Sequence, residues 1–382
     1  MFEKTGLFLL LVLINTVKSL SFPDFIRNSN HKDGKTFAVL VAGSTGIENI
    51  RHQLDVCRVY GQLRKYGVKE ENIQVLMNGV EDVRRFGSGS NGIPCDIPKS
   101  KNASLSNLIE AMNFTKSIHG SKNRFIFYFS GYAGPSLMLL PQEILTKDVM
   151  NKTISTLYRQ RVFKKLVFYV EAPYATSIFD GILPNTGNFM LITASQATST
   201  SYATDCRVYD GLPTCLGDKF TVNWIKGSAN KNQTTRMEYF EEMSTFDVNT
   251  WIKKKQIQIA QKQNKTALIC ELNWQLDYIS LITSFAIEDI TAIHNAFVVD
   301  QKRDNRKMAG YLGMKKRIKC ESEIIIAFSK SCYDVTKMPF LVQHIQPLLN
   351  LCTVGVSTSS IINVMSETCK EAPVQELIPL CK

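Results

Sequence analysis

Five short apolar runs constrain the fold of this 382-residue chain more than any other feature of its sequence. Each run is rich in β-branched and aromatic residues, and most are separated from the next by a longer polar or helical stretch. The runs occupy residues 37–42, 73–77, 124–129, 166–170 and 189–193. Apolar strands of this kind suit burial on both faces, so the pattern predicts an α/β fold with a mostly parallel sheet flanked by helices.

The predicted sheet also indicates where a functional site should form, because sites in open α/β sheets lie just beyond the carboxyl ends of the strands. Those positions are residues 43–52, 130–135, 171–177 and 194–202. A helix is predicted over residues 49–65, since apolar residues from Leu54 to Leu63 recur at helical spacing. We expect Cys57 to be a buried thiol on the apolar face of this helix.

The N-terminus has the layout of a secretory signal peptide over residues 1–19. Lys4 precedes an apolar run over residues 7–17, and Ser19 or Ser21 offers a small residue for cleavage. That run is too short to span a bilayer and no later segment reaches about 18 apolar residues, so no transmembrane segment is expected. The sequence therefore predicts a protein of the secretory pathway, either extracellular or endolysosomal.

Five Asn-x-Ser/Thr sequons follow the predicted signal peptide. They lie at Asn102, Asn113, Asn151, Asn232 and Asn264. In a secreted chain such sequons are typical of glycosylated surface loops, and we expect a subset of the five to be occupied.

The basic excess of the chain, 45 Lys and Arg against 34 Asp and Glu, is concentrated in one stretch. Eight basic residues and a single acid lie between Lys302 and Lys319. One interpretation is a patch that binds a polyanion, either a glycosaminoglycan or an anionic lipid surface. The other, which we favour, is a solvated linker with dibasic protease sites at Lys302-Arg303 and beyond. Nucleic acid is not an expected partner, because no aromatic residues for base stacking alternate with these charges.

The last third of the chain changes to helical patterns. Apolar residues from Ile287 to Phe297 fall on one helical face, and further helices are predicted over residues 321–332, 340–351 and 359–371. The predicted organisation is a signal peptide (1–19), an N-terminal segment (20–34), an α/β domain (35–272), a helix with a basic linker (273–318) and a small helical domain (319–382).

Cysteine spacing predicts disulfides in the helical domain. Its four cysteines are Cys320, Cys332, Cys352 and Cys369, which allow three pairings, and the sequence does not choose among them. Two disulfides are an expected source of stability in a small secreted helical domain. Cys206 and Cys215, nine residues apart in an apparent loop insertion, predict a local disulfide.

Several long motifs in the same order resemble legumain, the asparaginyl endopeptidase family with a caspase-like fold. The first are Val39-Leu-Val-Ala-Gly-Ser-Thr-Gly46 and Asn49-Ile-Arg-His-Gln-Leu-Asp-Val-Cys57, and further matches cover residues 125–129, 166–172, 201–203 and 216–224. The C-terminal four-cysteine pattern, with Leu349-Asn-Leu-Cys352, resembles the helical prodomain of legumain. The resemblance implies a caspase-like domain followed by a disulfide-linked helical domain.

The departures from the family pattern fall on the two catalytic positions. Where legumain has Thr-Asp-His-Gly, this chain has Ser130-Gly-Tyr132-Ala, and where legumain has Glu-Ala-Cys-Glu, it has Glu171-Ala-Pro173-Tyr. Tyr132 therefore stands at the His position and Pro173 at the Cys position, with the spacing that the family uses. The resemblance thus implies that the catalytic base and nucleophile are both absent.

These two substitutions remove the chemistry of a cysteine peptidase. Cysteine proteolysis needs a thiolate and a neighbouring base, and proline offers neither a nucleophile nor a backbone N–H for an oxyanion. A tyrosine phenol ordinarily ionises near pH 10, so it does not act like histidine at neutral or acidic pH. Thr176 and Ser177 lie nearby without an evident base, and no metal-ligand spacing is present, so neither a metal site nor a cofactor is expected.

The substrate-pocket positions of the family are retained. In legumain an Arg and acidic residues bind the Asn carboxamide, which needs one donor and one acceptor. The matching positions, with their neighbours, are Asn49, Arg51, His52, Glu171, Thr200, Ser201 and Asp218. One interpretation is a surviving Asn-binding pocket. The other is that the buried charges persist because removing one would strand its partner, at a cost of about 3–5 kcal/mol.

The sequence therefore predicts a catalytically inactive legumain-like protein that binds Asn-containing peptides or a protease partner. Because such a chain cannot cleave itself, we expect the helical domain to stay attached and to keep the pocket covered. Two alternatives remain, namely an asparaginyl cysteine endopeptidase with residual activity and a secreted polyanion-binding protein.

Overall fold

The computed structural model describes residues 34–87, 93, 95–113, 122–161, 163–184, 187–209, 211–229, 243–303 and 313–369. The predicted signal peptide, the sequon at Asn232 and residues 304–312 of the basic stretch lie outside these ranges. None of the helices among the described residues is long and apolar enough to cross a membrane.

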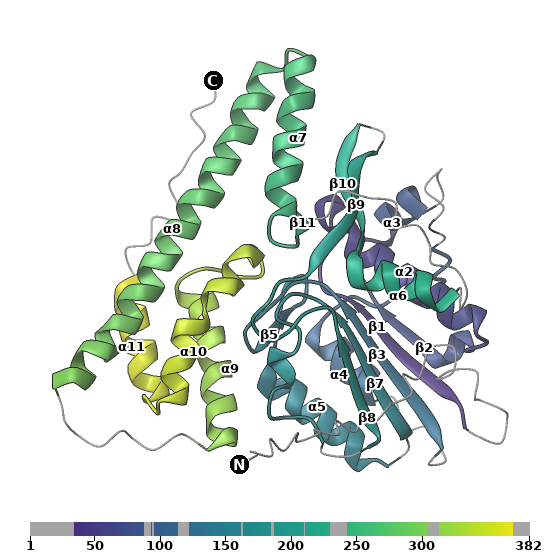
Figure 1. Ribbon diagram of the computed structural model, residues 1–382, viewed down its shortest axis with the longest axis horizontal. Coiled ribbons are helices and arrows are strands. Elements are labelled where there is room, and N and C mark those ends of the chain that lie inside the picture. The colour runs from purple at the N-terminus through teal and green to yellow at the C-terminus, as the bar shows by residue number, and fades with distance from the viewer. Residues whose placement is uncertain are drawn as a thin grey trace, which may run out of the picture.

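A five-stranded parallel sheet forms the centre of the first two thirds of the chain (Figure 1). Its strands in spatial order are β2 (Ile73–Leu76), β1 (Thr36–Ala42), β3 (Asn123–Ser130), β7 (Phe163–Glu171) and β8 (Phe189–Thr193). Every neighbouring pair runs parallel. All five predicted strands are present, so the predicted caspase-like α/β fold is confirmed.

Helices cover both faces of this sheet, because its strands are apolar on both sides. Helices α4 (Leu105–Asn113) and α5 (Lys147–Arg159) pack on the face that includes Phe127 and Phe129. Helices α2 (Ile50–Lys65), α3 (Val80–Gly87) and α6 (Lys219–Ala229) pack on the face that includes Leu40 and Tyr128. The alternation of Phe127, Tyr128 and Phe129 between the two cores follows from the two-residue period of a strand.

Two small antiparallel sheets lie beside the central one. One contains β4 (Ala133–Gly134), β5 (Leu137–Leu139) and β6 (Ile144–Thr146), and the other contains β9 (Tyr202–Tyr209), β10 (Leu212–Asp218) and β11 (Met243–Ser244). Short 3-10 helices are η1 (Ile47–Asn49), η2 (Glu70–Asn72), η4 (Ser177–Phe179) and η5 (Pro339–His344). These sheets bring residues far apart in the sequence to the carboxyl edge of the parallel sheet.

Two disulfides stabilise the α/β part. Cys206 and Cys215 are bonded across the β9–β10 hairpin, which stands where a loop insertion was expected. The prediction of a thiol at Cys57 is wrong, because this buried residue forms a disulfide with Cys95. Cys95 lies 38 residues away, in a segment without a helical or strand pattern. No local sequence pattern therefore predicts that the two cysteines are bonded.

The last third of the described chain is helical. Helices α7 (Val248–Lys262) and α8 (Thr266–Arg303) lie side by side (Figure 1). Helices α10 (Gln346–Thr353) and α11 (Thr358–Thr368) pack against α8, and α9 (Met314–Ser331) packs against α10 and α11. Disulfides Cys320–Cys352 and Cys332–Cys369 select one of the three pairings. Helix α8 shares one apolar core with these helices, since Ile290 and Ile293 belong to the same cluster as Leu348.

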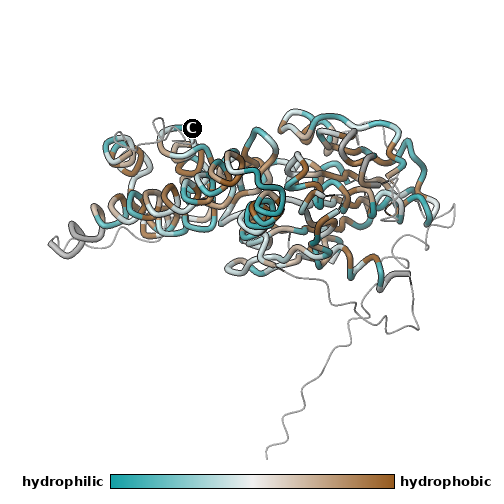
Figure 2. The backbone as a smooth tube through the Cα atoms, turned by 90° about the horizontal axis from the view of Figure 1, so that it is seen from above, coloured by the Kyte–Doolittle hydropathy of each residue, from teal (hydrophilic) through white to brown (hydrophobic). Residues whose placement is uncertain are grey.

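An apolar interface joins the helical part to the α/β part, and the two lie against each other when seen from above (Figure 2). Tyr132 and Phe246 of the α/β part belong to the same buried cluster as Leu341 and Val342 of η5. The two backbones approach closely at Gly134, where a Cβ atom would lie 2.7 Å from the carbonyl oxygen of Val342. Glycine is therefore needed at this point of contact.

A buried ion pair forms a second contact across this interface. Glu321 on α9 is 5% exposed, and its Oε2 lies 3.3 Å from Lys147 Nζ on α5. The same oxygen accepts a hydrogen bond from Ser136 Oγ at 2.9 Å. Arg317, part of the predicted basic stretch, pairs with Glu321 and with Asp180. This arginine is therefore engaged at the interface, whereas Lys315, Lys316 and Lys319 are exposed.

The aromatic core of the sheet should dominate the stability of the α/β part. Phe168 is fully buried and its ring lies 4.9 Å, centroid to centroid, from both Phe127 and Phe189. We expect Phe168→Ala to lower the free energy of unfolding by about 3–5 kcal/mol, because it leaves a cavity. Chemical denaturation followed by tryptophan fluorescence checks this. The control is Ile109→Ala on the exposed side of α4, with an expected change within about 0.5 kcal/mol; equal losses would contradict the assignment of this core.

Candidate functional site

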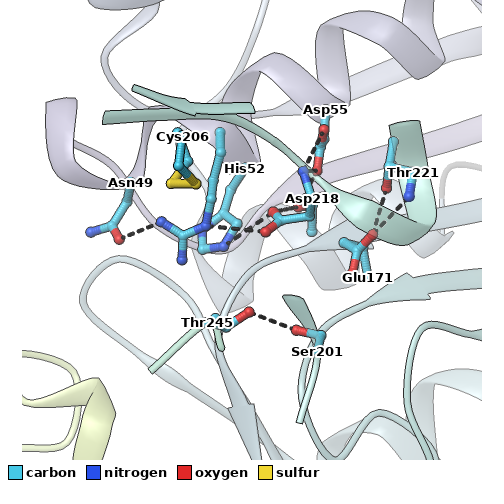
Figure 3. A network of polar contacts seen from close by, with 12 residues as sticks. Asn49, His52, Asp55, Glu171, Ser201, Cys206, Asp218, Thr221 and Thr245 are labelled. Atoms are coloured by element: carbon cyan, nitrogen blue, oxygen red, sulfur yellow. Dashed lines mark hydrogen bonds and ion pairs between the residues drawn. A yellow bond between two sulfur atoms is a disulfide. The ribbon is translucent and has the colours of Figure 1, made fainter. Parts of the chain in front are cut away.

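Five of the predicted site residues meet at the carboxyl edge of the parallel sheet (Figure 3). Glu171 ends β7, and Asp218 ends β10. Asn49, Arg51 and His52 lie at the start of α2, which follows the loop after β1. The sheet edge, the hairpin and the helix start therefore position these five residues, as expected for an open α/β sheet.

Arg51 lies at the centre of the site and is fully buried. Its Nε donates to Asp218 Oδ1 at 3.1 Å, and its Nη1 donates to the Glu48 carbonyl at 3.2 Å and to Asn49 Oδ1 at 3.3 Å. Its Nη2 is buried without a hydrogen-bond partner in the described part of the chain. A buried donor without a hydrogen-bond partner costs about 1–3 kcal/mol. A ligand that accepts a hydrogen bond from Nη2 would remove this cost.

Glu171 contributes the complementary atom. Its Oε2 accepts hydrogen bonds from the Thr221 amide at 2.8 Å and from Thr221 Oγ1 at 3.1 Å. Its Oε1 is buried and has no hydrogen-bond partner among the described residues. One side of the carboxyl group is thus fixed by the start of α6, while the other side remains able to accept a hydrogen bond.

Three carboxyl groups gather here, those of Asp55, Glu171 and Asp218. Asp55 was not among the predicted site residues. The Asp218 amide donates to Asp55 Oδ2 at 3.2 Å, and Arg58 Nη1 lies 3.0 Å from Asp55 Oδ1. Burial, followed by the charge of Asp218, holds the pKa of Asp55 and that of Glu171 well above their ordinary values. Asp55 follows Arg51 by four residues, a helical spacing that could have signalled a shared face.

His52 is buried between Ser44 and Asp218. Its Nδ1 lies 2.6 Å from Ser44 Oγ, and its Nε2 lies 3.5 Å from Asp218 Oδ2. Burial, and then the charge of Arg51, lowers the pKa of His52 well below its ordinary value, so the ring is neutral near pH 7. A neutral ring fits the contact at Nδ1, which can accept a hydrogen bond from the Ser44 hydroxyl.

Tyr132 fills the space at the position that the resemblance assigns to the catalytic His. Its hydroxyl donates to Asn49 Oδ1 at 2.9 Å, so this oxygen accepts from both Tyr132 and Arg51. The Arg51 guanidinium carbon lies 5.5 Å from the ring centroid, the His52 ring meets it edge-on, and Phe246 stacks on it. The ring is 3% exposed and therefore belongs to the buried structure.

Pro173 lies buried in the turn that follows β7. The next residue, Tyr174, has a φ of 51°, in the left-handed region that favours glycine, and its amide donates to the Ser199 carbonyl at 2.8 Å. This turn is therefore strained locally and is held by the loop that precedes β9.

Thr200 and Ser201 lie apart from the charged cluster in their contacts. Ser201 Oγ lies 2.8 Å from Thr245 Oγ1 (Figure 3). Thr200 Oγ1 donates to the Ser201 carbonyl at 3.1 Å and lies 3.2 Å from Ser244 Oγ. Their hydroxyl groups thus tie the loop before β9 to the turn after β11. Within the described residues, no group of three or more His, Cys, Asp or Glu side chains could hold a metal ion.

The described sequons are at the surface but do not all lie in loops. Asn102 and Asn264 are exposed in loops. Asn113 ends α4 and Asn151 lies within α5, and both are half-buried. The expectation that every sequon lies in a loop is therefore wrong for these two residues.

The carboxyl cluster predicts a specific pH dependence of stability. Because the pKa of Asp55 is raised in the folded chain, the folded state retains a proton that the unfolded state releases above about pH 4. This contribution to stability is present at low pH and is lost as the pH rises. Asparagine cannot ionise, so we expect the stability of Asp55→Asn relative to the wild type to increase between about pH 4 and pH 8.

Urea denaturation midpoints measured across this pH range check the prediction. The control is Glu110→Gln, which removes a carboxyl group that is 63% exposed and pairs with Lys101. Its stability curve should run parallel to that of the wild type. A parallel curve for Asp55→Asn would show that Asp55 does not retain the extra proton.

Comparison with known proteins places the chain in a family. The model of the peptidase C13 family matches residues 36–268. The chain is 33% identical over 253 residues to the vacuolar-processing enzyme beta-isozyme of Arabidopsis thaliana, covering 57% of this chain and 51% of that protein. It is 32% identical over 225 residues to a hemoglobinase of Schistosoma mansoni, covering 53% and 52%.

In these two alignments the chain spans about half the length of the relative. A longer alignment, at 25% identity over 411 residues, covers 89% of this chain and 94% of the hemoglobinase of Schistosoma japonicum. The match to the family model covers more than half of the chain, and the parallel sheet and the buried arginine–carboxylate site lie within it. The chain therefore belongs to the peptidase C13 family, the legumain family that its motifs resemble.

Proposed function

We propose that this protein is a catalytically inactive member of its family that binds Asn-containing peptides at the Arg51–Glu171–Asp218 site. One observation carries the proposal. Arg51 Nη2, a donor, and Glu171 Oε1, an acceptor, are both buried without a hydrogen-bond partner in the described structure. A carboxamide presents one acceptor oxygen and one donor nitrogen, so it would satisfy both atoms at once.

The absence of catalysis follows from the residues at the two central positions. Pro173 has no nucleophilic atom and no amide hydrogen to stabilise an oxyanion. The hydroxyl of Tyr132 donates to Asn49, and its ring is enclosed by apolar side chains of the helical part. Peptide hydrolysis by the family's cysteine mechanism needs a thiolate and a base, and neither position supplies one.

Access to the site requires a movement of the helical part. Arg51, Glu171 and Asp218 are each at most 1% exposed, and η5 packs over Tyr132 at the same edge. The bound peptide would therefore compete with the interface formed by Leu341 and Val342. We place this binding in the lumen of the secretory pathway, on the basis of the N-terminal signal pattern and the relatives named vacuolar-processing enzymes.

Calorimetric titration with an Asn-containing peptide, and with its Ala-substituted counterpart, tests the proposal. Gly134→Ala serves as a wedge, since its Cβ would lie 2.7 Å from the Val342 carbonyl and force η5 to shift. We expect this variant to bind the Asn peptide saturably and the wild type to bind it more weakly. Adding Glu171→Gln should reduce the affinity at least about tenfold, equivalent to about 1.4 kcal/mol.

Gly61→Ala is the matched control, because a Cβ at Gly61 meets no atom within 4 Å. It should behave as the wild type. Hydrogen exchange over residues 339–344 reports whether the wedge has loosened the cover. A loosened cover without heat specific to the Asn peptide would contradict the proposal.

An enzymatic alternative has one observation in its favour. A hydroxyl, an imidazole and a carboxylate lie in series at Ser44, His52 and Asp218. Ser44 Oγ is 2.6 Å from His52 Nδ1, and His52 Nε2 is 3.5 Å from Asp218 Oδ2. Such a set could activate a serine nucleophile. We expect no hydrolysis of a fluorogenic Asn peptide by the wild type or by Gly134→Ala. Turnover that disappears in Ser44→Ala would establish the enzyme instead.

A further inference from the structure

A cavity lies at the amino edge of the parallel sheet, at the opposite end of β7 from the Arg51–Glu171–Asp218 site. It has a volume of about 400 Å³ and is bounded by the end of α5, the start of β7 and the residue that precedes β8. Phe163 begins β7 and Glu171 ends it, so the two sites are about 26 Å apart along the strand. The cavity is therefore separate from the proposed carboxamide site, and its occupation does not depend on that function.

Two basic side chains line this cavity, those of Arg161 and Lys164, and none of the described lining residues is acidic. Both residues are exposed, and within the described part of the chain neither side chain has a hydrogen-bond or ion-pair partner. Between Asp148 and Glu171 the chain has five Lys or Arg residues and no acid, and residues 181–204 contain no charged residue. The cavity therefore has two positive charges that no lining carboxylate offsets.

The backbone departs from regular geometry at both of these basic residues. Arg161 has a φ of 52°, in the left-handed region that favours glycine. Phe163 and Lys165 pair with consecutive residues of β3, so Lys164 between them is the extra residue of a β-bulge. A bulge changes the direction in which a side chain points from the one that regular alternation would give. Two separate irregularities of the backbone thus place the two cations on one cavity.

The charges of the cavity favour an anionic ligand. Arg and Lys side chains bind phosphate and sulfate oxygens through charge-assisted hydrogen bonds. The volume falls within the range of about 300–1,000 Å³ that is typical of small-molecule sites, so there is room for more than a bare ion.

The other lining side chains favour a sugar as the carrier of the anion. Tyr158 is 38% exposed, and its ring offers an apolar surface on which the C–H groups of a sugar ring can pack. The amide of Asn188 supplies both a donor and an acceptor for hydroxyl groups. We propose that this cavity binds a sugar whose ring carries a phosphate or sulfate monoester.

Ligand-observed NMR titration of the full chain tests the proposal, with glucose 6-phosphate and N-acetylglucosamine 6-sulfate as the probes. We expect at least one ester to bind at least about tenfold more tightly than glucose and than inorganic phosphate. The reason is that only an ester contacts the cations and the aromatic surface together. Equal affinity for inorganic phosphate would show a site for a bare anion and would overturn the proposal. Absence of binding by both esters up to about 10 mM would overturn it as well.

Two variants remove the cations one at a time. Arg161→Asn introduces a residue that tolerates the left-handed backbone, and Lys164→Gln keeps part of the side-chain stem. Each should weaken binding of the ester at least about tenfold, equivalent to about 1.4 kcal/mol. Lys152→Gln is the matched control, because it removes one positive charge from α5 at a side chain that is 74% exposed and lies outside the cavity lining. Equal losses in all three variants, or no loss in the first two, would contradict the assignment of this cavity.

Chemical modification gives a second measurement that does not depend on a variant folding. Phenylglyoxal modifies arginine side chains, and mass spectrometry of the digested wild-type chain gives the rate at each arginine. With the ester at about ten times its dissociation constant, modification of Arg161 should slow about tenfold. Arg207 on β9, whose side chain is 56% exposed, should react at an unchanged rate. An unchanged rate at Arg161 would overturn the proposal, whatever the outcome of the Asn-peptide titration.

Discussion

The buried pair of Arg51 and Asp218 is the interaction on which the rest of the site depends. It joins the start of α2 to the end of β10 at 3.1 Å, with neither side chain more than 2% exposed. Asp55, His52 and Tyr132 are each arranged around one member of this pair. Removing either partner would leave a charge buried without compensation, at about 3–5 kcal/mol. The geometry of the site would therefore persist whether or not it still binds a ligand.

In the proposed function, Tyr132 links two properties, namely the absence of a catalytic base and the packing of the helical cover over the site. A catalytic base must reach its substrate, so it needs a polar and accessible environment. Tyr132 instead contributes an apolar ring to the cluster that contains Val342, while its hydroxyl retains Asn49 as a partner. Under the proposed function, the side chain that supplies no base is therefore also the one that packs against the cover.

The sequence predicts the sheet well because a strand buried on both faces leaves a continuous apolar run, and all five such runs form strands. The prediction that Arg51 and Asp218 share a site depended on the resemblance to a family. The two residues are 167 positions apart, and no helical or strand period relates residues at that separation. Asp55 was missed although it lies one helical turn from Arg51. The prediction of a thiol at Cys57 was wrong because its disulfide partner, Cys95, belongs to a loop whose path is fixed by tertiary packing.

The length of α8 has a mechanical consequence. Its 38 residues form one uninterrupted helix, about 57 Å long. Three residues separate this helix from α7, and α10 and α11 pack against it. Helices that pack against one rigid helix move together with it. The helical part should therefore rotate as one rigid body about the short turn at Asn264. That residue already has a left-handed φ of 53° and belongs to an Asn-x-Thr sequon. A sugar chain attached at Asn264 would lie at the pivot and would restrict how far the helical part can swing.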